Sequence, residues 1–256
     1  MAEGDTIHRA ARRIGAALGE KEVAVAAPNP RGRVAGVERL DGRRLVAAVA
    51  RGKNLLLDFD DLVLHSHLGM SGSWHVYRRG ESWRKPAGAA WVVLRGDEAE
   101  AVQFGGPKLR VIRAETLRRD PVLARLGPDV LDEDFDAEVV ARSLGAVPDR
   151  TLGDALLDQT LVAGIGNIFK SEACFAARVD PWQPVGELST EQLHRVLQAA
   201  HDLMREAVER GRQPRAVYRR AGQPCTACGK PIAARGQGDA NRTTYWCQRC
   251  QPGSNN

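Results

Sequence analysis

Four cysteines late in the chain have the spacing of a metal site. They form two Cys-x-x-Cys pairs separated by eighteen residues: Cys225 and Cys228, then Cys247 and Cys250. Four thiolates at this spacing suit one tetrahedral zinc ion, and the segment between the pairs, with Gly236 and Gly238, is expected to fold as a β-hairpin. A redox dithiol is the alternative. Two matched pairs favour one structural Zn²⁺, without which so small an element would not fold.

Basic residues are concentrated in the same segment. Residues 211–256 carry eight Lys and Arg side chains against one acidic residue, Asp239, so this segment has a formal charge of +7 in a chain of total charge +5. Such a surface suits phosphates. Arg242, five residues before Cys247, is placed to grip a phosphate with its planar guanidinium. On charge alone, a solvated basic tail and a surface arginine remain the alternatives.

The rest of the pattern mixes helix and strand. Asp5 is expected to cap a helix that ends at Gly19. Short β-type runs separated by turn residues follow as far as Ile112, and they indicate an antiparallel sandwich or barrel. The runs are 45–49, 55–59, 62–68, 91–94, 101–104 and 109–112.

Helical patterns dominate the second half. Residues 116–144 are mostly helical in pattern, and 145–150 carry the Gly, Pro and Asp signals of a hinge. Two short helices, 152–159 and 168–177, are joined by a turn of small residues. Ser189 and Gln192 form a capping box for a long core helix, and Cys174 is most simply a buried core thiol.

Composition excludes several classes of protein. No apolar run reaches the roughly 18 residues that a membrane helix needs. Nothing at the start has the pattern of a secretion signal, and five cysteines clustered late in the chain point to metal rather than to disulfides. We therefore expect a cytoplasmic protein without a membrane partner.

Three separated motifs together resemble the formamidopyrimidine-DNA glycosylase/endonuclease VIII family. The start Met-Ala-Glu-Gly-Asp is similar to that family's Met-Pro-Glu-Gly opening. Leu157-Asp-Gln159 through Gly164-Ile-Gly-Asn167 resembles its helix-two-turns-helix element, and the segment from Arg242 to Gln251 resembles its zinc-finger signature. The resemblance runs along essentially the whole chain.

The resemblance implies an α+β fold: an N-terminal β-sandwich with an N-terminal helix, plus a helical helix-two-turns-helix domain that ends in a β-hairpin zinc finger. The expected boundaries are 1–114 for the β-sandwich catalytic domain, 115–150 for a helical segment and hinge, 151–218 for the helix-two-turns-helix DNA-binding domain, and 219–256 for the zinc finger. The implied partner is damaged double-stranded DNA with the lesion flipped out of the stack. A monomer associated with the nucleoid is the default.

The implied activity is base excision with an associated lyase step at abasic sites. The Ala2 amine would be the nucleophile, since an α-amine has a pKa of about 7.7–8.0 against about 10.4 for lysine. Glu3 would be the acid that helps open the sugar ring. Lys53 would contact phosphate and assist elimination, and Arg242 would hold the phosphate beside the lesion and assist a second (δ) elimination. Taken alone, Glu3 reads as a helix N-terminal charge and Lys53 as a surface lysine.

The same residue-by-residue matching implies three DNA contacts. Met70 would be the apolar wedge that fills the space left by the flipped nucleotide, and Arg125 and Asn167 would hold DNA. His65 and His67 share a strand face, but no third ligand is near them in the sequence, so hydrogen-bonded histidines at a sheet edge are expected rather than a second metal site.

Two departures from the family pattern matter. Ala2 stands where the family has proline, so removal of Met1 would leave a primary amine whose imine must be protonated before it can accept electrons. We predict a weaker or slower lyase. The segment 103–109 does not reproduce the arginine- and phenylalanine-bearing loop of the formamidopyrimidine branch, which favours the endonuclease VIII side and oxidised pyrimidines over 8-oxoguanine.

Two rival readings stay open at this point. The first is a binder of damaged or abasic DNA that lacks a competent nucleophile, and Ala2 is its support. The second is an unrelated zinc-ribbon regulator, for which residues 1–70 would have no role in DNA chemistry.

Overall fold

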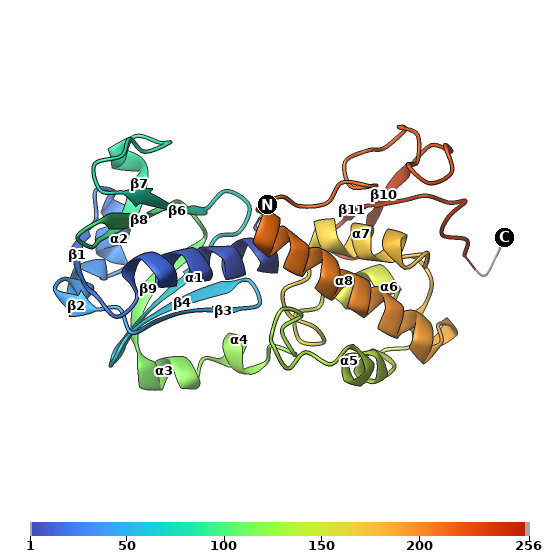
Figure 1. The fold of residues 1–256 in the computed structure, drawn as a ribbon. Coiled ribbons are helices and arrows are strands. Elements are labelled where there is room, and N and C mark those ends of the chain that lie inside the picture. The colour runs from blue at the N-terminus through green and yellow to red at the C-terminus, as the bar shows by residue number, and fades with distance from the viewer. Residues whose placement is uncertain (1, 254–256) are drawn as a thin grey trace. The chain divides into compact units, whose positions relative to one another are not determined.

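The computed structural model describes residues 2–253, which belong to two compact units, Met1–Arg125 and Leu126–Asn256 (Figure 1). The finer four-part division stays a prediction. Within residues 2–253, no helix combines the length and the apolar character needed to cross a bilayer.

The N-terminal unit contains two antiparallel sheets. One has the order β2-β1-β7-β8-β6 and the other the order β3-β4-β5-β9. The strands are β1 (Glu22–Ala26), β2 (Arg43–Arg44), β3 (Ala47–Arg51), β4 (Asn54–Phe59), β5 (Leu62–His67), β6 (Ser73–Arg78), β7 (Ala90–Arg95), β8 (Ala99–Phe104) and β9 (Lys108–Arg113). The helical elements are α1 (Gly4–Leu18), α2 (Pro30–Val34), η1 (Val37–Leu40), η2 (Ala87–Ala89), α3 (Ala114–Arg118) and α4 (Pro121–Ala124).

One hydrophobic core holds α1 and both sheets together. Ile7, Ile14 and Leu18 recur at helical spacing, and all three are fully buried. They pack into the same cluster as alternate residues of β4, such as Leu55 and Leu57, and as residues of β7. The predicted β-sandwich with an N-terminal helix is therefore confirmed, and the start of α1 is fixed by a packed core.

Local expectations in this unit were partly wrong. The N-cap of α1 is Glu3 rather than Asp5, which lies buried in the first turn. Strands β1, β2 and β6 were not expected, because their short runs mix charged, alanine and apolar residues, and pairing within the sheet decides their conformation. Residues 125–136 lie within a stretch that was expected to be mostly helical, but they contain no helix: α4 ends at Ala124, and Gly127-Pro128 follows two residues later.

The C-terminal unit is a helical bundle followed by a two-stranded hairpin. Its elements are α5 (Ala137–Leu144), α6 (Leu152–Leu157), α7 (Asn167–Ala176), η3 (Val185–Glu187), α8 (Thr190–Arg210), β10 (Ala233–Gln237) and β11 (Arg242–Trp246). The capping box of α8 is present, with both the Ser189 and the Gln192 side chains bonded to the opposite backbone. Leu193, Val196 and Met204 of α8 pack against α5, α6 and α7. The predicted helical domain ending in a hairpin is confirmed.

Candidate active site and metal centre

The start of the chain lies beside a pocket within the N-terminal unit. The Ala2 nitrogen is 3.4 Å from the carbonyl oxygen of Gly69, in the loop between β5 and β6. A cavity of about 240 Å³ opens there, lined by Ala2, Thr6 and Met70 among others. Arg9, Arg13 and Arg84 also line it, so its walls are positively charged. Met1, and with it the expected removal of that residue, lies outside the described residues.

Glu3, which follows the pocket-lining residue Ala2 in the sequence, is fully buried. It is the N-cap residue of α1, and its carbonyl oxygen accepts from the amides of Thr6 at 3.0 Å and Ile7 at 3.3 Å. A carboxylate at this place gains from the positive end of the helix dipole. The start of α1 therefore fixes the backbone of Glu3, the residue that directly follows the predicted nucleophile Ala2.

The loop that carries Met70 is tightly constrained while its tip is open to solvent. Met70 is 69% exposed, one of five large apolar side chains that are exposed among the described residues. Gly69 has φ of +57° and a Cβ there would lie 2.8 Å from Pro107, while a Cβ on Gly72 would lie 2.6 Å from the Leu68 carbonyl oxygen. A closely packed loop backbone at two glycines, with an exposed methionine between them, has the form that a wedge requires.

Lys53 occupies the tight turn between β3 and β4. The turn closes through the paired residues Arg51 and Asn54, and Gly52 supplies the left-handed conformation at φ of +58°. Lys53 is half-buried, and its charge reaches His67: burial first, then the charges of Lys53 and Lys108, lower the pKa of that imidazole.

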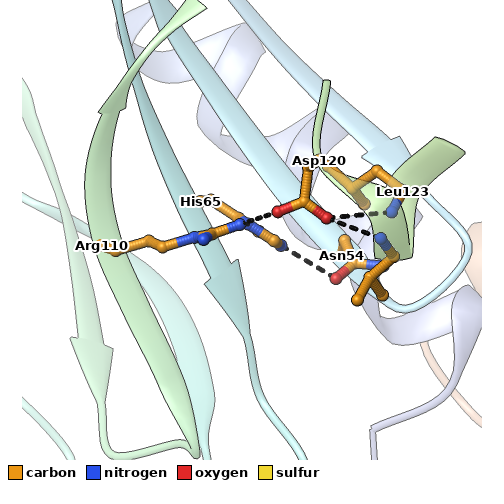
Figure 2. Close-up of polar contacts among 6 residues, drawn as sticks. Asn54, His65, Arg110, Asp120 and Leu123 are labelled. Atoms are coloured by element: carbon orange, nitrogen blue, oxygen red, sulfur yellow. Dashed lines mark hydrogen bonds and ion pairs between the residues drawn. The ribbon is translucent and has the colours of Figure 1, made fainter. Parts of the chain in front are cut away.

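A buried polar network begins at this turn (Figure 2). Asn54 donates from Nδ2 to the Arg51 carbonyl oxygen at 3.2 Å, and its Oδ1 lies 2.9 Å from Nε2 of His65. The other ring nitrogen, Nδ1, accepts from Nε of Arg110 at 3.3 Å and from Nη2 at 3.1 Å. Arg110 also pairs with Asp120. His65 is fully buried on β5, an inner strand of its sheet, so the expectation of a sheet-edge position was wrong although the hydrogen bonding was confirmed.

Asp120 carries the network into α4. Its Oδ1 accepts from the amides of Val122 at 2.9 Å and Leu123 at 3.1 Å, which caps the helix (Figure 2). Burial raises the pKa of this carboxyl, but the hydrogen bonds from Arg110 and from the two amides outweigh it and bring the pKa to about 2. Arg125 follows immediately as the C-cap residue of α4, and it is exposed.

In the C-terminal unit, the turn before α7 is fixed by one amide. Gln159 donates from Nε2 to the carbonyl oxygens of Leu157 at 2.9 Å and Ile165 at 3.1 Å, and its Oε1 accepts from the Gly164 amide at 3.1 Å. Gly164 has φ of +98°. Asn167 then begins α7, buried, with Nδ2 donating to the Thr243 carbonyl oxygen at 2.8 Å. Its Oδ1 is buried without a hydrogen-bond partner among the described residues.

The hairpin is attached to the same face of α7. Besides Asn167, the fully buried Lys170 donates from Nζ to Oγ1 of Thr244 at 2.6 Å, and Oγ of Ser171 accepts from the Tyr245 amide at 3.4 Å. Arg242 is the first residue of β11, adjacent to this attachment, and its side chain is exposed. The structure thus brings Asn167 and Arg242 together within one unit.

The four cysteines converge as the spacing predicts. Their Sγ atoms all lie within 4.8 Å of one another, with Cys228 and Cys247 at 3.5 Å and Cys225 and Cys250 at 3.9 Å. Four sulfurs at the usual zinc–sulfur distance from one tetrahedral ion are about 3.8 Å apart. The cluster can therefore hold a metal ion, and the donor set fits zinc. Cys174 lies apart from it, fully buried on α7, and burial raises the pKa of this thiol to about 12.

The predicted residues fall into two groups. Ala2, Glu3, Lys53, Met70 and Arg125 belong to the N-terminal unit, whereas Asn167, Arg242 and the cysteine cluster belong to the C-terminal one. Sequence reasoning missed the link from Asn54 through His65 to Arg110 and Asp120, and it missed Lys170. No local spacing signals these contacts, because β5, β9 and α4 meet only in the folded sheet.

Comparison with known proteins gives a consistent result for both units. The formamidopyrimidine-DNA glycosylase N-terminal domain matches residues 1–112, and the formamidopyrimidine-DNA glycosylase H2TH domain matches residues 126–217. A probable endonuclease 8 2 of Streptomyces coelicolor is 41% identical over 99% of this chain and 95% of its own length. The DNA-(apurinic or apyrimidinic site) lyase Nei2 of Mycolicibacterium smegmatis is 36% identical over 99% and 100%.

Solved structures share the fold. The Lactococcus lactis Fpg in complex with DNA that contains N7-benzyl-Fapy-dG has a TM-score of 0.81 at 24% identity, covering 98% of this chain and 100% of that one. The same protein bound to DNA with an abasic site gives 0.82 at 23% identity, with the same coverage.

Proposed function

The chain belongs to the formamidopyrimidine-DNA glycosylase/endonuclease VIII family, near the endonuclease VIII branch, and on that premise we propose that it is a base-excision-repair DNA glycosylase with an associated lyase activity at abasic sites. Relatives named as endonuclease 8 and as abasic-site lyase align over nearly its whole length. The observation that carries the proposal is the position of Ala2, which lines a basic pocket together with the exposed Met70.

The residues support the following chemistry. The unprotonated Ala2 amine attacks the sugar C1′, the glycosidic bond breaks and the base leaves with its electron pair. Glu3 gives a proton to the ring oxygen, the sugar opens, and the nitrogen and C1′ form a protonated imine. The Glu3 carboxylate, which has given up its proton, takes a proton from C2′; the C–H electron pair moves into the protonated imine, and the C3′–O bond breaks with the 3′ phosphate as leaving group. Loss of the C4′ proton to water then breaks the C5′–O bond with the 5′ phosphate as leaving group. Water then hydrolyses the imine and frees the amine.

Charged side chains in both units suit the phosphates of such a substrate. Lys53 in its two-residue turn, Arg125 after α4 and Arg242 at the start of β11 each present a cation on a constrained segment. Asn167 has a buried amide at a helix start. We propose that these residues hold the damaged duplex, that Met70 fills the gap left by the flipped nucleotide, and that Lys53 and Arg242 assist the eliminations.

Zinc is the ion we propose for the cysteine cluster, in a purely structural role. All four ligand positions are filled by thiolates, which leaves no open position for substrate. The ion would fix the hairpin that carries Arg242. We further propose that the enzyme acts as a monomer, in the cytoplasm at the nucleoid, where its substrate lies.

Oxidised pyrimidines such as thymine glycol are the substrates we favour. The segment 103–109 turns sharply at Gly105 and Gly106, both with positive φ, and it carries no arginine. The arginine- and phenylalanine-bearing loop of the formamidopyrimidine branch is therefore not reproduced in this segment.

Borohydride trapping tests the function directly. The protein is incubated with duplexes that contain thymine glycol, 8-oxoguanine or an abasic site, reduced with borohydride, and analysed by intact mass and peptide mapping. We expect a covalent adduct at the Ala2 amine, with thymine glycol trapped faster than 8-oxoguanine. An adduct at a lysine instead, or no adduct with an exposed Ala2 terminus, would contradict the mechanism.

One alternative has specific support. Ala2 gives a primary amine where the family pattern has a secondary one, and a binder of abasic DNA with an impaired lyase would show the same fold. Tight, lesion-dependent binding without strand cleavage would establish that alternative.

A further inference from the structure

The network of Asn54, His65, Arg110 and Asp120 joins two surface turns of the N-terminal unit. At one end, Asn54 closes the turn that carries Lys53, and at the other end Asp120 caps α4, which ends at Arg125. Three of the four side chains are more than nine-tenths buried, and Arg110 is 36% exposed. Buried polar networks whose members are all satisfied tend to rigidify the segments that they join.

The hydrogen bonds show which ring nitrogen of His65 carries the proton. Because Nδ2 of Asn54 donates to the Arg51 carbonyl oxygen, its Oδ1 is the acceptor that faces His65. His65 therefore carries its proton on Nε2 and accepts from Arg110 at Nδ1. A second proton would have to sit on Nδ1, against the guanidinium. Burial, followed by the Arg110 charge, lowers the pKa of His65 to about 4, so this arrangement is the same throughout the neutral range.

Each end of the network supports a segment that carries a proposed phosphate-binding residue, Lys53 at one end and Arg125 at the other. The turn at Arg51–Asn54 contains only two residues between its paired ends, so the side chain of Asn54 fixes the backbone next to Lys53. Helix α4 has four residues, too few to be stable alone, and its cap from Asp120 is its main local support. Loss of either connection would leave the sheet folded, but the segment that carries Lys53 or Arg125 would no longer be held in one position.

We propose that His65 is a positioning residue for DNA binding, which holds Lys53 through Asn54 and the α4 segment ending at Arg125 through Arg110 and Asp120. The inference rests on the proposed function, since Lys53 and Arg125 matter as a pair only if they bind phosphates. It adds a residue that touches no substrate to the groups that bind DNA. It also explains why a histidine lies fully buried directly after the three buried apolar residues Leu62, Val63 and Leu64 of the same strand.

A double-mutant cycle tests the coupling of His65 with Lys53. The dissociation constant for a duplex with a tetrahydrofuran abasic analogue is measured for wild type, Lys53→Met, His65→Leu and the double variant. We expect Lys53→Met to weaken binding about tenfold, the value of one lost charge-assisted contact. His65→Leu should weaken it more, because the segment that ends at Arg125 is released as well. The double variant should be little weaker than His65→Leu alone, because His65→Leu already misplaces Lys53. Likewise, the magnitude of the slope of log K against log salt should fall by about 0.9 in Lys53→Met, by more than that in His65→Leu, and little further in the double variant.

Ser66→Ala is the matched control on the same strand. Ser66 is fully buried, and its Oγ accepts from Nε1 of Trp74 at 3.1 Å and from Nε2 of Gln103 at 3.2 Å, away from Lys53. Its removal should lower the melting temperature and combine with Lys53→Met multiplicatively. If His65→Leu does not fold, His65→Asn carries the same test, because it keeps an acceptor towards Arg110 and loses the donor to Asn54.

The outcomes distinguish a failure of the positioning role from a failure of the proposed function. Wild-type protein that binds the abasic duplex, with His65 and Lys53 effects that multiply like those of Ser66, overturns the positioning role and leaves the proposed function intact. Wild-type protein with no preference for the abasic duplex and no trapped adduct refutes the proposed function, and the positioning role falls with it.

Discussion

Glu172 is the buried carboxylate that ties α7 to the segment leading into the cysteine cluster. It is 2% exposed, and it accepts three backbone hydrogen bonds: from Ala216 at 2.8 Å, Val217 at 3.0 Å and Tyr218 at 2.7 Å. Val217 is fully buried and packs against Cys225 and Cys247. We predict that Glu172→Ala will be severe, because the change leaves a row of buried amides without an acceptor.

The magnitude follows from the number of amides. Each buried amide left without a partner costs about 1–3 kcal/mol, and Val217 and Tyr218 are both buried while Ala216 is half-buried. The two buried amides alone amount to roughly 2–6 kcal/mol, which is a large part of the 5–15 kcal/mol typical of a domain. Glu172→Gln should lose about half as much, because its oxygen can still serve Val217 and Tyr218 while its amide group faces the Ala216 N–H.

The assay is urea unfolding of metal-loaded protein, followed by tryptophan fluorescence and by metal release to a coloured chelator. Metal release isolates the C-terminal unit, so the two units need not unfold together. Glu187→Ala removes the same charge from an exposed position and should shift the free energy of unfolding by less than about 0.5 kcal/mol. A Glu172→Ala loss below about 1 kcal/mol, or a loss equal to that of Glu187→Ala, would refute the reasoning.

Three further predictions concern the amine, the metal and pH. Ala2→Pro should raise the rate of borohydride trapping on the order of tenfold, because a secondary amine gives a cationic iminium without extra protonation; an unchanged rate would show that imine protonation is not limiting. Removal of the metal by chelation, or Cys228→Ser, should melt the hairpin and abolish DNA binding while unfolding of the N-terminal unit is unaffected; retained binding by metal-free protein would exclude the structural role. The pKa of His65 is about 4 in the folded protein and 6.5 in the unfolded chain, so the unfolded chain binds the proton first as the pH falls. The contribution of His65 to stability should therefore be complete above pH 6.5, and the free energy of unfolding should fall by roughly 3 kcal/mol as the pH drops to about 4. Asp120, whose pKa is lowered to about 2, should add a further loss towards pH 2. Urea midpoints against pH for wild type and His65→Asn measure this, and identical profiles would contradict it.

Features set by nearby residues were predictable from the sequence. The capping box of Ser189 and Gln192 involves only residues three apart, and the Cys-x-x-Cys pairs need only local turns. The start of the chain and the turn before Asn167 could be assigned because their motifs are contiguous. Each of these signals lies within a few consecutive residues, so it can be recognised without knowledge of the tertiary structure.

Features set by distant residues were not predictable. The contact between His65 and Arg110 joins residues 45 apart in the sequence, and its existence depends on the register of β5 against β9. Strand β6 was missed because half of its side chains are polar, and pairing with β8 decides its conformation. Asp5 was expected to be the N-cap, but burial of Ile7 against the sheets accompanies a helix that starts two residues earlier, with Glu3 as its N-cap.

Because Cys174 is buried, its rate of labelling by a thiol reagent can measure how often the core of the C-terminal unit opens. When a metal ion occupies the other four cysteines, Cys174 is the remaining thiol in the chain. It lies on α7 and points into the hydrophobic core of the C-terminal unit. A thiol reagent can reach it only during transient openings of that core, so the labelling rate reports the free energy of opening. Slower labelling on addition of a lesion duplex would measure, without any cleavage assay, how much the bound DNA stiffens the helices that hold Asn167.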